Sequence, residues 1–96
     1  MIISFGDKAT EDLYHGRSTS RVHKLPRDVL NAALIKMDIL EAAAKPIDLK
    51  SPPGNQLETL KGDYKDFYSI RVNKQWRLIF KWQGRDAYEV KLVDYH

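Results

Sequence analysis

Hydrophobic and polar residues alternate with a period of two along residues 67–80, in the second half of the chain. Such alternation is typical of strands with one buried face. The alternating apolar residues are Tyr68, Ile70 and Val72 in the first run and Trp76, Leu78 and Phe80 in the second. Residues 73–75 (Asn-Lys-Gln) separate the runs, and asparagine favours the tight loop of a hairpin. Arg71 and Arg77 occupy polar positions, so we expect both to project from the face of the sheet opposite the core.

A helical period marks residues 26–44, where apolar side chains recur every three or four positions. The expected buried stripe consists of Leu30, Ala33, Leu34, Met37, Leu40 and Ala44. Pro26 suits the first turn of this helix, and Pro46 lies just beyond its end. A shorter helix is expected to run from Asp7, as its cap, to about His15.

The remaining segments complete a sheet. Residues 2–5 are expected to form an outer strand, residues 57–61 a short strand and residues 87–94 a final strand, with a stiff proline-rich loop at residues 47–56. In the final strand, the residues expected to point the same way are Tyr88, Val90 and Leu92. Because helices come early and strands late, the sequence predicts an α+β fold. It would consist of an antiparallel-rich sheet of about four to five strands with two N-terminal helices packed on one face.

The composition is typical of one soluble globular domain covering residues 1–96, with 43% hydrophobic and 30% charged residues. The chain has no cysteine, which excludes a disulfide framework and thiolate chemistry. Its apolar runs are shorter than the roughly 18 residues of a membrane span, and residues 1–13 do not have the order of a secretory signal. The net charge of +3 permits a nucleic-acid partner without requiring one.

Candidate catalytic residues lie at the end of the chain, at the end of the last expected strand and directly after it. They are Asp94, Tyr95 and His96. Strand parity can place Tyr95 on the face of Arg77, with His96 just beyond, and Lys61 ends the neighbouring short strand. This set suits RNA cleavage, since histidine transfers protons near neutral pH and cations stabilise the charge that grows on phosphate. Alternatively, Arg77 pairs with an acid such as Asp94, and the last two residues only close the sheet.

A second basic group lies between the two expected helices, in residues 17–27. It consists of Arg17, Arg21, Lys24 and Arg27. Such a segment is either a solvated connector or a contact to RNA phosphates. The three histidines, His15, His23 and His96, lack the spacing of metal ligands, and there is no glycine-rich phosphate loop. We therefore expect neither a metal nor another cofactor.

Several motifs together carry a family resemblance. The segments PPGNQLETLKGDYKDFYSIRVNKQWRLIF and DAYEVKLVDYH, with the opening IISF, resemble the HigB-type killer proteins of bacterial toxin–antitoxin modules, in the RelE superfamily. The resemblance covers nearly the whole chain. It implies a compact RelE-like fold and a ribosome-dependent endoribonuclease that cuts mRNA in the A site of the small ribosomal subunit, in the bacterial cytoplasm.

The resemblance also implies partners. A cognate HigA-type antitoxin with a helix-turn-helix domain would inhibit the toxin, and the pair would repress its own operon. Operator DNA would therefore be contacted only through the antitoxin, and no membrane is involved.

By motif, the resemblance assigns cleavage roles to Arg77 of QWR and to Tyr95 and His96 of DYH, with Asp94 beside them. Some relatives carry a basic residue at the position of Asn73, so the resemblance implies a phosphate contact there or from a neighbour. Arg71 and Lys74 both remain open for that role. Lys61 of LKGD is a further expected contact.

The sequence is also compatible with two other functions. One is a gyrase-poisoning toxin of the same superfamily, which binds without chemistry of its own. The other is a ribosome-associated RNA-binding module, which would not need His96 for activity.

Overall fold

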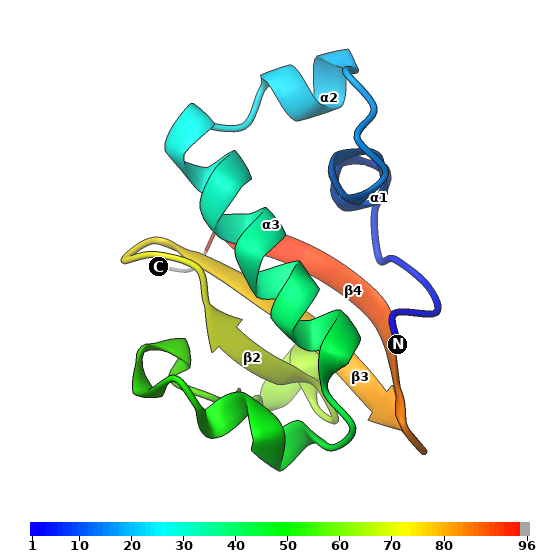
Figure 1. Cartoon of the computed structure of the whole chain (residues 1–96), viewed down its shortest axis with the longest axis vertical. Coiled ribbons are helices and arrows are strands. Elements are labelled where there is room, and N and C mark those ends of the chain that lie inside the picture. The colour runs from blue at the N-terminus through cyan, green and yellow to red at the C-terminus, as the bar shows by residue number, and fades with distance from the viewer. Residues whose placement is uncertain (95–96) are drawn as a thin grey trace.

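The computed structural model describes residues 1–94 and shows helices on one face of an antiparallel sheet (Figure 1). The sheet has four strands in the order β1-β2-β3-β4. Their bounds are Glu58–Thr59 for β1, Tyr68–Arg71 for β2, Trp76–Gln83 for β3 and Asp86–Asp94 for β4. Each strand is antiparallel to its neighbour. The predicted α+β class and the central hairpin are therefore confirmed.

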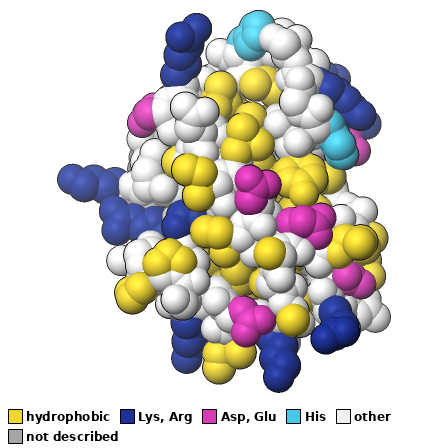
Figure 2. All heavy atoms as spheres, in the orientation of Figure 1, with side chains coloured by type: hydrophobic (Ala, Val, Ile, Leu, Met, Phe, Trp, Pro, Cys, Tyr) yellow, Lys and Arg dark blue, Asp and Glu magenta, His cyan; other side chains and the backbone are white. Residues whose placement is uncertain are grey.

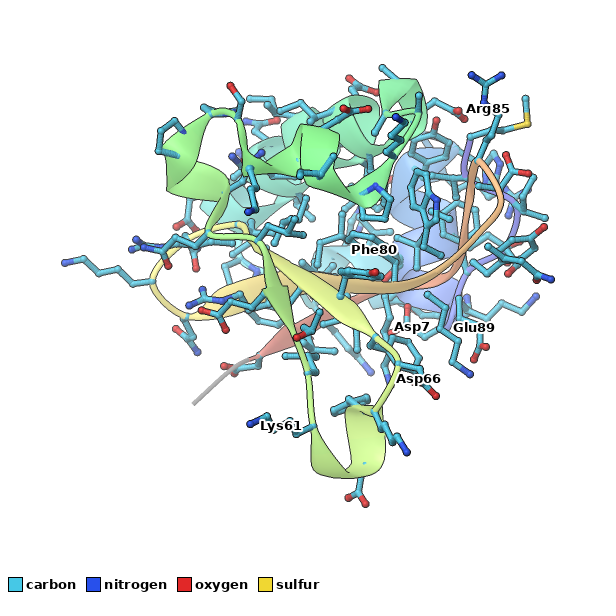
Figure 3. All side chains as sticks on the ribbon, turned by 90° about the horizontal axis from the view of Figure 1, so that it is seen from below. Asp7, Lys61, Asp66, Phe80, Arg85 and Glu89 are labelled. Carbon is cyan, nitrogen blue, oxygen red and sulfur yellow. The ribbon has the colours of Figure 1, made fainter. Side chains whose placement is uncertain are left out.

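The long helix α3 (Arg27–Ala42) lies across the sheet and supplies one side of the core (Figure 1). Its buried residues are Val29, Ala33, Met37 and Leu40. The predicted stripe was thus correct at its centre but not at its ends, because Leu30 and Leu34 are only half-buried and Ala44 is exposed. From the sheet, Ile70, Leu78 and Phe80 complete the core and are fully buried. Figure 3 shows Phe80 between the sheet and the helices.

Helix α1 (Lys8–Tyr14) begins and ends where the sequence predicts. The Asp7 carboxylate accepts a hydrogen bond of 2.8 Å from the Thr10 amide, which satisfies a donor in the first turn. Gly16 follows the helix with a φ of +71°, the left-handed conformation that glycine adopts easily. The Thr10 hydroxyl then accepts from the Leu92 amide at 3.0 Å, which fastens α1 to β4.

The basic segment contains a helix that the sequence pattern did not predict, α2 (Ser20–His23). Thr19 caps it by accepting from the Val22 amide, and Val22 is buried in the core. One helical turn has too few hydrogen bonds to be stable alone. Its contacts with the preceding helix supply the missing stabilisation, so residues 17–27 are an ordered part of the domain and not merely a connector.

The proline-rich segment contains two short 3-10 helices, η1 (Pro46–Lys50) and η2 (Pro53–Asn55), which are ordered by one buried side chain. Asn55 is fully buried and donates to the carbonyl oxygens of Leu49 and Ser51 at 3.1 and 3.4 Å. Its side-chain oxygen accepts from Lys36 of α3. These contacts hold together a segment that has little regular secondary structure.

Residues 2–5 run parallel to β4 and form isolated bridges, Ile2 with Ala87 and Phe5 with Val90, in place of the expected full strand. At the next position, a Cβ on Gly6 would lie 3.1 Å from the Glu89 carbonyl oxygen and from the Lys91 Cβ. Glycine therefore suits this close approach, because a residue with a Cβ would require its neighbours to shift by a few tenths of an ångström. Within residues 1–94, the helices are too short and too polar to cross a membrane.

The predicted facing of Tyr88 was wrong because β4 contains a bulge. Ile79 pairs with Lys91 and Lys81 pairs with Tyr88, so one residue of β3 lies between these pairs but two residues of β4 do. One of those two, Glu89, has a φ of +52°. The extra residue shifts the alternation, so Ala87 is buried where the sequence pattern placed Tyr88.

Candidate active site

Two arginines lie side by side on the face of the sheet away from the helices. Arg71 of β2 is directly opposite Arg77 of β3 in the ladder, next to the core pair Ile70 and Leu78. Because side chains alternate between faces, burial of the core pair turns both arginines to the other side, as predicted. Both are half-buried, so each keeps access to a ligand while its stem packs on the sheet.

One carbonyl oxygen holds both guanidinium groups. Arg71 Nε donates to the Asn73 carbonyl oxygen at 3.2 Å, and Arg77 Nη1 donates to the same oxygen at 2.9 Å. Arg77 Nη1 also lies 3.4 Å from the Trp76 carbonyl oxygen. Two like charges at directly opposed positions repel each other. An anion bound between them would remove this repulsion, and guanidinium groups suit phosphate in particular.

The Asn73 side chain fixes the turn that presents this carbonyl. Its Oδ1 atom accepts from the backbone amides of Gln75 and Trp76, both at 2.8 Å. This is the local hydrogen bonding by which asparagine stabilises turns. Asn73, which the resemblance placed among the RNA contacts, therefore orients the arginines through its backbone.

Gln75 connects the turn to the end of β4 and was not singled out from the sequence. Its Nε2 atom donates to Asp94 Oδ2 at 3.0 Å, and Asp94 pairs with Trp76 in the ladder. The neighbouring Lys74 is exposed at the tip of the turn. The structure thus brings together the hairpin turn, the two arginines and the residue that precedes the predicted Tyr95 and His96. Those last two residues lie outside the described part of the chain.

Lys61 lies on a loop of residues 60–67 that contains the 3-10 helix η3 (Gly62–Tyr64). Figure 3 shows this loop, with Lys61 and Asp66, on the side of the sheet away from the helices. Lys61 is exposed. It therefore shares a side of the sheet with Arg71 and Arg77, although it comes from a different segment.

The helix side of the molecule differs from the arginine side in the kinds of side chains at its centre. Figure 2 shows that hydrophobic and acidic side chains occupy the centre of this side, whereas lysines and arginines lie toward its edges. The arginine pair lies on the opposite side of the sheet.

The basic group of residues 17–27 is partly neutralised. Asp12 of α1 is only 5% exposed, and its two oxygens lie 3.3 Å from Arg17 and 3.4 Å from Arg21. Burial pushes the pKa of Asp12 upward, but hydrogen bonds from Thr19 and Arg17 and the charge of Arg21 outweigh it, so this pKa lies below its usual value. Lys24 and Arg27 are exposed.

Burial raises the pKa of Tyr14, and the nearby carboxylates of Glu41 and Asp38 raise it further. Among residues 1–94, histidine, aspartate and glutamate side chains form no group of three or more that could hold a metal ion.

The sheet and its helical cover define a fold class that is shared by solved structures. YafQ from E. coli superposes with a TM-score of 0.62 at 14% identity, covering 98% of this chain and 91% of YafQ. The YoeB-YefM complex from Staphylococcus aureus gives a TM-score of 0.62 at 17% identity, covering 100% of this chain and 95% of the matched chain.

Within this class, the chain belongs to the HigB-like toxin family. Residues 3–96 match the family described as the RelE-like toxin of the type II toxin-antitoxin system HigB. The chain is 45% identical over 82 residues to Toxin HigB-1 of Vibrio cholerae, covering 85% of this chain and 84% of that protein. It is 33% identical over 96 residues to Endoribonuclease HigB of Proteus vulgaris, covering both chains completely.

Proposed function

We propose that this toxin is an endoribonuclease that cleaves mRNA in the ribosomal A site and thereby stops translation. The observation that carries the proposal is the convergence of Arg71 and Arg77 on one carbonyl oxygen, which prepares two guanidinium groups for one phosphate. Relatives named as a HigB toxin and a HigB endoribonuclease support the reaction class.

In the proposed reaction, the 2′-hydroxyl of the RNA loses its proton to solvent as its oxygen attacks the adjacent phosphorus, and the bond to the 5′-oxygen breaks. The products are a 2′,3′-cyclic phosphate and a free 5′-hydroxyl. Arg77 stabilises the charge on the phosphorane, and Arg71 shares this role. His96 gives a proton to the leaving oxygen, and Tyr95 binds the substrate. Asp94, held by Gln75, positions this end of the chain. These roles require no metal ion.

Lys61 and the turn residue Lys74 are proposed to contact flanking phosphates. Lys61 is the stronger candidate of the two, because its loop lies on the arginine side of the sheet (Figure 3). Asn73 acts as a positioning residue, since its carbonyl oxygen binds both arginines.

The reaction is proposed to depend on the ribosome because so small a site has few groups to hold a flexible RNA in the geometry of attack. Attack requires the 2′-oxygen, the phosphorus and the 5′-oxygen to lie nearly in line, and holding reactants in such geometry is worth about 7–11 kcal/mol. We propose that the A site holds the mRNA in this geometry. Arg17, Arg21, Lys24 and Arg27 would bind ribosomal RNA. Lys24 and Arg27 would contribute most, because Asp12 already neutralises part of the charge of the other two.

A type II toxin has an antitoxin partner. We propose a HigA-type antitoxin with a helix-turn-helix domain, which binds operator DNA and inhibits the toxin in the bacterial cytoplasm. The YoeB-YefM complex supports the existence of such a partner. Co-expression of the neighbouring gene product should suppress toxicity and yield a complex that is stable on size exclusion.

The test compares one mRNA, free and in a ribosome with an empty A site, under single-turnover conditions. Rapid cleavage only on the ribosome is the expected result, and equal cleavage of both would refute ribosome dependence. Expression in bacteria with mapping of mRNA 5′ ends should reveal cuts in frame with translated codons. DNA damage without such cuts would indicate a gyrase poison instead. Neutralising Lys24 and Arg27 should weaken ribosome binding and flatten its salt dependence.

A further inference from the structure

A hollow lies at the other end of the β2–β3 hairpin from the arginine pair. It measures about 700 Å³ and is lined by the loop of residues 60–67, the start of β2 and the end of β3. The residues that matter for its chemistry are Lys61, Lys65, Phe67, Tyr68 and Trp82. Both lysines are exposed, and the three aromatic side chains are half-buried. The hollow thus combines cations at its rim with aromatic walls.

The aromatic walls are held in place by their own contacts. The indole N–H of Trp82 donates to the Gly84 carbonyl oxygen at 2.9 Å. Tyr68 stacks on the buried Phe80 with 5.8 Å between ring centroids. The Phe67 ring lies 5.1 Å from Lys81 Nζ, and that ammonium also pairs with Glu89 at 3.2 Å. The walls are therefore ordered before any ligand arrives.

We infer that this hollow binds one nucleobase of the RNA substrate, next to the nucleotide whose phosphate contacts Arg71 and Arg77. This inference rests on the proposed ribonuclease function and adds a binding subsite to it. Single-stranded RNA is recognised by aromatic side chains that stack on bases together with cations that follow the backbone. Phe67 and Trp82 provide the first property, and Lys61 and Lys65 provide the second.

The spacing along the hairpin fits neighbouring nucleotides. Phe67, which lines the hollow, precedes Arg71 by four positions, a separation of about 13 Å along an extended chain, and this even spacing turns both side chains to the same face of the sheet. Lys61 belongs to the loop on the arginine side of the sheet (Figure 3) and lines the hollow as well. One extended RNA strand can therefore place a phosphate at the arginines, the next phosphate near Lys61 and a base in the hollow. Asp66, also in the lining, offers a hydrogen-bond acceptor to an exocyclic amino group of that base.

The two tryptophans allow this inference to be tested directly, because Trp82 lines the hollow whereas Trp76 lies at the arginine end of β3. We would follow both indole N–H resonances by NMR during titration with an RNA trinucleotide blocked by 2′-O-methyl groups. The expected result is a saturable shift of the Trp82 resonance. An abasic trinucleotide with the same phosphates should shift the Trp76 resonance but leave that of Trp82 nearly unchanged. Equal Trp82 shifts with both ligands, or a Trp82 resonance that does not move at millimolar RNA, would overturn the base subsite.

A charge reversal at an exposed position tests the rim without disturbing the core. Lys65→Glu should raise the Kd of the blocked trinucleotide about tenfold, and Lys50→Glu, the same change on η1 outside this hollow, should leave it unchanged. Equal effects of the two changes would show general electrostatics and overturn the subsite. Cleavage on programmed ribosomes is measured separately for the wild type. Cleavage without a base-dependent Trp82 shift would reject the subsite alone, whereas a base-dependent shift without cleavage would reject the ribonuclease and retain the subsite.

Discussion

Arg71 and Arg77 donate to the same acceptor, the carbonyl oxygen of Asn73, from two directly opposed positions of neighbouring strands. One backbone atom thus sets the separation and direction of both guanidinium groups. A disturbance of the turn that displaces this carbonyl would affect both cations together.

Replacing Arg77 should remove most of the activity. Arg77→Ala should lower single-turnover cleavage on programmed ribosomes by roughly 10²–10³-fold, the scale of deleting one donor to the transition state. Arg77→Lys should also be poor, because an ammonium group lacks the planar fork that binds two phosphate oxygens. Full activity of the lysine variant would contradict bidentate phosphate recognition.

Arg71 should matter more than Lys74, although both are basic and close to the turn. Arg71 shares the acceptor of Arg77, whereas Lys74 is exposed at the tip. We expect Arg71→Ala to lower cleavage by about tenfold or more, and Lys74→Ala, the matched comparison whose proposed contact is to a flanking phosphate, to lower it less. The double variant Arg71→Ala/Arg77→Ala should lose less than the product of the single losses, because the residues act on one phosphate. A larger loss from Lys74→Ala would reverse the assignment.

His96 should be required for chemistry but not for folding. His96→Ala, or removal of that residue, should lower cleavage by about 10²–10⁴-fold, the usual contribution of one general acid or base. Thermal melting of the same variants serves as the control and should match the wild type. Undiminished toxicity of the folded variant would exclude His96 from the reaction.

Two substitutions of Asn73 should separate its role in the turn from its effect on the arginines. Asn73→Ala removes the acceptor of two backbone amides. The loss should cost about 1 kcal/mol, or roughly 4–8 °C in Tm, and should lower cleavage as well.

Asn73→Asp keeps that acceptor and should retain the melting temperature. It should still lower cleavage, because the added carboxylate competes with phosphate for the arginines. Equal melting temperatures for the alanine variant and the wild type would argue against a structural role for this side chain.

Asp12 should make stability depend on pH in the acid range. Its pKa is lowered in the folded state, so its contribution to stability is present above the unfolded pKa of about 3.9 and is lost as pH falls through the lower folded value. The difference in urea midpoint between the wild type and Asp12→Asn should therefore shrink below about pH 4. A pH-independent difference would contradict this account. Asp38→Asn, on the exposed side of α3, is the control.

The hairpin and α3 were predictable because each is encoded by a local period of apolar residues. The turn was predictable because Asn73 carries its own hydrogen-bonding chemistry. In contrast, α2 is ordered by Asp12, which binds Thr19 and Arg21 from another helix. The spacing of apolar residues within residues 17–27 could not reveal that contact, because Asp12 lies outside this segment.

The bulge in β4 was missed for a similar reason. The amide of Glu89 donates to the Ser4 hydroxyl at 3.0 Å, and the amide of Val90 donates to the Ser4 carbonyl oxygen at 3.0 Å. This irregularity is therefore stabilised by residues more than eighty positions away. At the site, strand parity correctly predicted that Arg71 and Arg77 share a face. Their common acceptor, and the bond from Gln75 to Asp94, depend on exact turn geometry, which parity does not specify.

The parallel bridges of residues 2–5 have a consequence for the behaviour of the free toxin. An open sheet edge invites pairing with another chain and hence aggregation. Ile2 and Phe5 cover part of the outer edge of β4, while the opposite edge belongs to β1, which is only two residues long. Within residues 1–94, neither edge offers a long unprotected strand. A toxin that is free of its antitoxin must remain dispersed in order to act, and these short, partly covered edges favour that outcome.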